Sequence, residues 1–71
     1  MIKYLIIIEK TETGYSAYVP DLPGCIATGR TKQMVERRIY EAIQFHLEGL
    51  KEEHIAIPSP KTEATTVLLH I

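Results

Sequence analysis

The sequence predicts an α+β fold of the order β-β-β-α-β, an antiparallel meander with one helix packed on one sheet face. Three short apolar or alternating segments follow one another with short links before Arg30, as in a meander. Apolar residues then recur at spacings of three and four from Val35 to Leu50, which is the period of an amphipathic helix. An alternating, β-branched segment at Thr65–Ile71 predicts a final strand.

The first two strands form a predicted hairpin. Ile2–Ile8 is an apolar, β-branched run that fits a buried strand. The run is too short for a membrane span of about 20 residues, and it lacks the basic lead-in and cleavage site of a signal peptide. Glu12-Thr13-Gly14 has the composition of a hairpin turn. The second strand, Tyr15–Val19, alternates, so that one face carries Tyr15, Ala17 and Val19.

A loop with two prolines separates the second and third strands. Pro20–Gly24 cannot continue a central strand, because proline has no N–H to donate to a neighbour. Pro23-Gly24 is typical of a type II turn, since proline sets φ at the first central position and glycine accepts a positive φ at the second. The third strand is expected at Cys25–Thr28, ending at Gly29.

The helix is expected to begin after Thr31, whose hydroxyl can accept a hydrogen bond from a free amide of the first turn. It should end near Glu52 or Glu53, with His54 in the left-handed conformation as a C-terminal cap. Ile57–Pro60 is expected to be an extended linker, because residues before proline avoid the α region. The apolar stripe of the helix consists of Val35, Ile39, Ala42, Ile43, Leu47 and Leu50.

Size and charge restrict the classes of function. The 71 residues predict one domain, residues 1–71, with a small core. Eight Lys and Arg against nine Asp and Glu give a net charge of −1, which argues against a general nucleic-acid binder. A single cysteine, Cys25, fits a reducing cytoplasm. A small fold without disulfides often gains stability by self-association, and alternate residues of Ile2–Ile8 are too apolar for an uncovered face, so we expect a homodimer or higher oligomer.

No set of residues predicts catalysis. Cys25 has no base or positive charge beside it in the sequence, so a buried packing role is favoured over a nucleophile. Asp21 is the only aspartate, and no cluster of acidic residues suggests a metal-dependent nuclease. His46 lies in the apolar stripe and is expected to be partly buried rather than a metal ligand. We therefore expect no enzymatic activity, no cofactor and no metal.

Two features could bind a partner. Arg30, Lys32, Arg37 and Arg38 form a basic patch at the start of the helix, which could meet phosphate or an acidic surface; a solvated helix face is the favoured alternative. The loop Pro20–Gly24 is stiffened by its prolines and could present Leu22 as an apolar anchor. It could equally be a tight corner with Leu22 turned inward, and the residues alone do not separate these two alternatives.

The loop also carries a family resemblance. Tyr18-Val19-Pro20-Asp21-Leu22-Pro23-Gly24-Cys25, followed by Ala27-Thr28-Gly29 and Thr31, resembles the signature of HicB-like antitoxins. The resemblance extends over residues 2–70 in the family's order. Its later parts are Ala42-Ile43, His46-Leu47-Glu48-Gly49-Leu50 and Ile57-Pro58-Ser59-Pro60. The sequence departs from the family at His54, where a glycine is frequent, and at Met34, where an acidic residue is frequent.

This resemblance implies a partial ribonuclease-H-like fold and a role in a toxin-antitoxin system. HicB proteins bind and block HicA toxins, which are small ribonucleases that cleave mRNA, and the antitoxin itself is not a catalyst. Typical full-length members add a carboxy-terminal DNA-binding domain; this sequence ends at Ile71, so direct DNA binding is not expected. We expect a cytoplasmic protein without membrane contact, whose partner-binding residues are Pro20, Asp21, Leu22, Pro23, Gly24, Arg30 and Arg38.

Two further hypotheses stay open at the level of sequence. The chain could be an orphan homo-oligomeric interaction module whose partner is not a toxin. It could also be a nucleic-acid binder that uses the basic patch, in which case binding would weaken steeply with salt.

Overall fold

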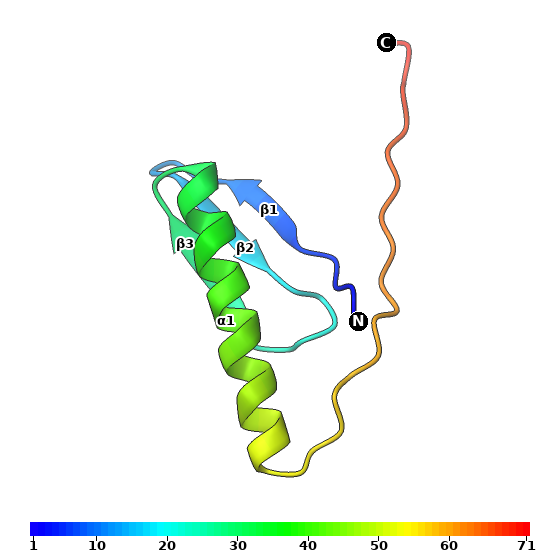
Figure 1. The fold of residues 1–71 in the computed structure, drawn as a ribbon. Helices are drawn as coiled ribbons and strands as arrows, with labels where there is room; N and C mark the ends of the chain where they lie inside the picture. The colour runs from blue at the N-terminus through cyan, green and yellow to red at the C-terminus, as the bar shows by residue number, and fades with distance from the viewer.

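The computed structural model describes all 71 residues and shows three antiparallel strands followed by one helix. The strands are β1 (Ile7–Lys10), β2 (Tyr15–Tyr18) and β3 (Ile26–Gly29), in the sheet order β1-β2-β3. The helix α1 (Lys32–Glu52) lies across one face of this sheet (Figure 1). The predicted α+β arrangement, with a meander covered by one helix, is confirmed.

The register of the strands separates the two faces of the sheet. Ile8 pairs with Ala17 and Ala17 with Ala27, and all three belong to the apolar layer on the α1 side. The neighbouring row, Ile7, Tyr18 and Ile26, is also in register and points to the opposite face, because side chains alternate along a strand. Ala17 and Val19 are buried and Tyr15 is half-buried, which confirms the predicted common face.

The core is small and lies off-centre. Only seven of the 71 residues are buried, and six of them form one apolar cluster between the sheet and α1: Ala17, Val19, Leu22, Cys25, Val35 and Ile39. The helix packs closely over β3 and β2, and β1 lies farther from it. The layer between sheet and helix is therefore closed on the β3 side and open on the β1 side.

Local hydrogen bonds define both ends of α1 where the sequence predicts them. The Thr31 hydroxyl accepts from the Met34 amide at 3.1 Å, which is an N-cap. At the other end His54 has φ of 58°, as expected for a left-handed cap. The His54 amide donates to the Lys51 carbonyl and the Ile55 amide to the Leu50 carbonyl, which is the complete bond pattern of a Schellman motif.

Two predicted strands differ substantially from the structure, and two others shift by one residue, since β2 ends at Tyr18 rather than Val19 and β3 begins at Ile26 rather than Cys25. The first strand begins at Ile7, not Ile2, because its partner β2 ends at Tyr18 and Pro20 follows with no N–H to offer. The fourth strand at Thr65–Ile71 is absent: the chain beyond Thr62 is exposed and projects away from the sheet (Figure 1). The alternating apolar pattern of Thr65–Ile71 suits a β-strand. A strand forms, however, only where the chain runs beside a sheet edge that can bond its backbone N–H and C=O groups.

Candidate partner-binding site

The loop between β2 and β3 is a pair of consecutive turns. The Leu22 amide donates to the Val19 carbonyl at 3.1 Å, and the Cys25 amide donates to the Leu22 carbonyl at 3.0 Å. The Val19 amide donates to the Cys25 carbonyl at 3.2 Å and closes the loop at its base. Gly24 has φ of 84°, so Pro23-Gly24 has the residue pattern and the positive φ of a type II turn, as predicted.

This double turn directs Leu22 inward. Leu22 has no exposed surface and packs in the apolar cluster with residues of β2 and α1. The inward alternative of the sequence analysis therefore describes this chain, and Leu22 supports the loop from beneath. The exposed part of the loop consists of Pro23 and Gly24, with Pro20 half-buried.

Asp21 anchors the carboxy-terminal segment. Its side chain is 7% exposed, and Oδ2 accepts hydrogen bonds from the Lys61 amide at 3.0 Å and the Thr62 amide at 3.1 Å. Oδ1 accepts a third bond from the Thr62 hydroxyl at 2.7 Å. The hydroxyl bond is the largest influence that lowers the pKa of Asp21; burial opposes it, and the two amides act in the same direction as the hydroxyl. We call this arrangement the Asp21 anchor.

Tyr4 adds a second attachment close by. Its hydroxyl donates to the Pro58 carbonyl at 2.6 Å, which joins the amino-terminal segment to the chain that follows α1. Burial, and secondly the negative charge of Asp21, raise the pKa of Tyr4. A hollow of about 490 Å³ lies between the loop and this returning segment, lined by Pro20, Asp21, Pro23, Pro58, Ser59 and Lys61.

Arg30 and Arg38 lie at the other end of β3 from the loop. Arg38 Nη1 donates to the Thr28 carbonyl at 3.0 Å, and Arg30 is exposed. Both arginines line a polar depression of about 420 Å³ beside the turn that joins β1 and β2. The structure thus divides the expected site residues into two groups at opposite ends of a strand of four residues, about 13 Å long.

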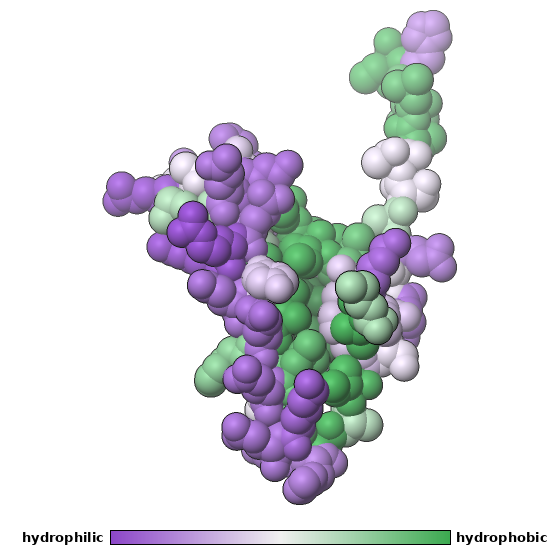
Figure 2. All heavy atoms as spheres, in the orientation of Figure 1, coloured by the Kyte–Doolittle hydropathy of each residue, from purple (hydrophilic) through white to green (hydrophobic).

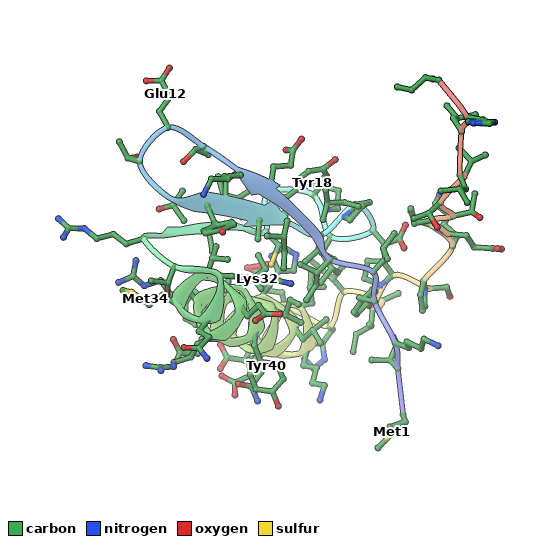
Figure 3. The ribbon with its side chains drawn as sticks, turned by 90° about the horizontal axis from the view of Figure 1, so that it is seen from above. Met1, Glu12, Tyr18, Lys32, Met34 and Tyr40 are labelled. Atoms are coloured by element: carbon green, nitrogen blue, oxygen red, sulfur yellow. The ribbon has the colours of Figure 1, made fainter.

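The row Ile7–Tyr18–Ile26 lies on the uncovered sheet face between these two groups. Figure 3 shows Tyr18 on the side of the sheet opposite α1. Tyr18 is 41% exposed and Ile26 is 70% exposed, whereas Ile7 is half-buried, so the apolar row is open to solvent over β2 and β3. Sequence reasoning expected an apolar uncovered face from Ile2–Ile8 but did not identify Tyr18 and Ile26, because the strand register that aligns them is a tertiary property.

The Asp21 anchor was also missed. From the sequence, Ile57–Pro60 is expected to be a plain extended linker, whereas Pro58 is bonded to Tyr4 and the next residues are bonded to Asp21. Nothing in the local sequence identifies the partner of Asp21 as Thr62, 41 residues away.

Cys25 and His46 are the remaining residues considered for catalysis or metal binding. Cys25 is buried in the apolar cluster, and burial raises the pKa of its thiol, which disfavours the reactive thiolate. His46 is half-buried on α1. No three His, Cys, Asp or Glu side chains gather closely enough to hold a metal ion, and α1 is not apolar enough to cross a membrane.

Comparisons with known proteins agree with this architecture. Residues 4–68 match the family described as the HicB_like antitoxin of bacterial toxin-antitoxin system. A UPF0150 protein of Thermoplasma acidophilum is 44% identical over 66 residues, which cover 92% of this chain and 96% of that protein. A UPF0150 protein of Helicobacter pylori is 42% identical over 55 residues, covering 78% of this chain and 76% of that protein.

The fold is also similar to solved structures of HicB3. The structure of the HicA3 and HicB3 toxin-antitoxin complex contains a chain that matches with a TM-score of 0.70 at 37% identity, covering 84% of this chain and 70% of that one. The crystal structure of antitoxin HicB3 matches with the same score and identity, covering 44% of its chain. With the family match over most of its length, this chain belongs to the HicB-like antitoxin family.

Proposed function

We propose that this protein is an antitoxin that binds and neutralises a HicA-like, mRNA-cleaving toxin and has no catalytic activity of its own. The observation that carries the proposal is the similarity, in both sequence and fold, to a chain from the HicA3 and HicB3 toxin-antitoxin complex. Neutralising such a toxin places the protein in the cytoplasm.

The proposed contact surface is the sheet face opposite α1. Its centre is the row Ile7–Tyr18–Ile26, in which Tyr18 and Ile26 are exposed and Ile7 is half-buried (Figure 3). An apolar centre with aromatic content inside a polar rim is the usual composition of a protein interface. A tyrosine at the centre also offers a large contact area at a small cost in side-chain entropy.

The expected site residues form the two ends of this surface. Pro23 and Gly24 are exposed at one end, on a loop whose shape depends on the inward Leu22 and on the Asp21 anchor. At the other end Arg30 follows β3, and Arg38 reaches from α1 to the Thr28 carbonyl, so both supply positive charge at the margin of this surface. Pro20, Asp21 and Leu22 thus contribute by holding the loop in position, and Pro23, Gly24, Arg30 and Arg38 contribute by contact.

The test is an RNA-cleavage assay with the HicA-like toxin of the source organism, titrated with the purified 71-residue chain. Inhibition that saturates at a fixed ratio of the two proteins is expected. Undiminished cleavage at excess of a folded chain would overturn the proposal and would favour an orphan interaction module with another partner.

Matched substitutions locate the surface. Ile26→Lys should weaken toxin binding by about 30-fold or more, as for a central interface residue. Phe45→Lys is the control, because Phe45 is a similarly exposed large apolar residue on α1. Arg30→Glu should weaken binding, whereas Arg37→Glu, at an exposed helix position outside the depression, should not. Equal affinities for Ile26→Lys and wild type would exclude the sheet face.

A further inference from the structure

The segment after the Asp21 anchor has the pattern of a strand but no hydrogen-bonded partner in its own chain, although Glu63 and Ala64 line a hollow beside Lys3–Leu5. Residues 63–71 are exposed, and no hydrogen bond joins them to the rest of the protein. In an extended chain Val67, Leu69 and Ile71 share one face, and each is at least 70% exposed. Figure 2 shows apolar side chains, in green, on the segment that projects from the body of the molecule. We call residues 63–71 the arm.

The body of the molecule has an apolar surface that lacks a cover. Since α1 packs closely over β3 and β2 rather than over β1, the second half of its apolar stripe is left half-exposed beside the amino-terminal segment. An open groove of about 490 Å³ lies there, and its apolar lining includes Ile2, Tyr4, Ile6, Tyr40, Ile43 and Leu47. Figure 2 shows this apolar band beside the polar outer face of α1. The adjacent edge of β1 has no neighbouring strand.

We propose that the arm of each copy lies along the β1 edge of a second copy, as the fourth strand of that copy's sheet, in a reciprocal dimer. The arm's apolar face, Val67, Leu69 and Ile71, fills the groove between the amino-terminal segment and α1 of the other copy. Strand addition to a free edge satisfies the backbone groups of both the arm and β1.

The Asp21 anchor is the reason that a second copy, rather than the same chain, receives the arm. Three hydrogen bonds to Asp21 and one from Tyr4 hold residues 58–62 beside the loop, and the chain then leads away from β1 (Figure 1). The radius of gyration is 14.0 Å, compared with about 11 Å for a compact domain of this length. A single copy is therefore less compact than a domain of this length, because the arm projects from it.

The count of arms and grooves, and the surface area that they would bury, both fit a dimer. Each copy has one arm and one groove, so a two-fold exchange uses every arm and every groove and leaves none over. The three large aliphatic side chains on the apolar face of the arm, Val67, Leu69 and Ile71, each present on the order of 100 Å². Two arms and the surfaces that receive them therefore bury about 1,200 Å², which is the lower end of the range for stable interfaces.

Light scattering after size-exclusion chromatography tests the dimer and the face of the arm that makes it. The wild type is expected at twice the 8.1 kDa mass of the chain. Val67→Lys with Leu69→Lys places two charges on the apolar face and should give a monomer. Thr66→Lys with His70→Lys places the same charges on the opposite face and should leave the dimer intact. A monomeric wild type at high micromolar concentration, or a dimer that survives Val67→Lys with Leu69→Lys, overturns the proposal.

An isotope-filtered NOE experiment on a mixture of labelled and unlabelled wild-type chains shows which copy receives the arm. Methyl contacts from Val67 and Leu69 to Ile43 and Leu47 are expected between labelled and unlabelled chains. The same contacts found only within one chain would show that the arm folds back on its own sheet, and they would overturn the exchange. The readouts do not involve a toxin, so they are independent of the proposed function.

Discussion

Replacing Leu22 by alanine tests whether a loop residue is part of the core. Leu22 lies between two turns in a segment without regular secondary structure, yet it has no exposed surface. It packs in the six-residue cluster with Val35 and Ile39, the two buried residues of α1. Leu22→Ala therefore removes apolar surface from the centre of the core and leaves a cavity that a stiff, proline-containing loop cannot close by collapsing.

The expected loss is large compared with the total stability. Substituting a fully buried leucine by alanine costs about 3 kcal/mol, within a range of about 2 to 5. A domain of 71 residues has a free energy of unfolding of roughly 4 to 11 kcal/mol. The substitution therefore removes between a quarter and most of the stability, and variants at the low end of this range would be partly unfolded at room temperature.

Urea unfolding followed by the helical circular-dichroism signal measures this loss. With an m-value of about 1 kcal/mol per molar, the midpoint should fall by about 3 M at a fixed protein concentration. Ile26→Ala is the control, because Ile26 is exposed on the sheet, and it should change stability by less than about 0.5 kcal/mol. A loss below about 1 kcal/mol for Leu22→Ala, or equal losses for both variants, would refute the inward placement.

Three further outcomes follow from individual contacts. Because the Asp21 carboxylate is stabilised by its bonds, its pKa in NMR titrations should lie below the ordinary 3.8 and should rise in Thr62→Val. The anchor's contribution to stability is then complete above pH 3.8 and is lost as pH falls through the lower folded pKa; an unshifted pKa contradicts this. Gly14→Ala should destabilise the chain, since the new Cβ would lie 2.9 Å from Arg30 Cα and closer still to the Gly29 carbonyl oxygen; Gly49→Ala, where the Cβ meets open space, should not. Thr31→Ala should cost about 1 kcal/mol through the lost cap and Thr31→Ser much less, both read from urea midpoints.

The elements that sequence reasoning located well are those specified by neighbouring residues. Thr31 caps α1 by bonding an amide three residues away, and His54 ends it by its own backbone conformation. Pro23-Gly24 turns the chain because proline restricts φ and glycine permits a positive φ. Such signals involve residues only a few positions apart in the chain, so they can be recognised from a single sequence.

The features that required the tertiary structure depend on residues far apart in the chain. The direction of Leu22 depends on whether α1 offers a cavity for it, and the role of Asp21 depends on donors that lie 40 and 41 residues further along. The extent of β1 is limited by where its partner β2 ends. At Thr65–Ile71 the alternating pattern correctly marks a segment suited to pairing, but pairing also needs a free edge in the right place. The sequence therefore contains the apolar faces, turns and caps of this HicB-like chain, while the three-dimensional packing determines which of those faces are covered, because burial is a property of two surfaces and not of one.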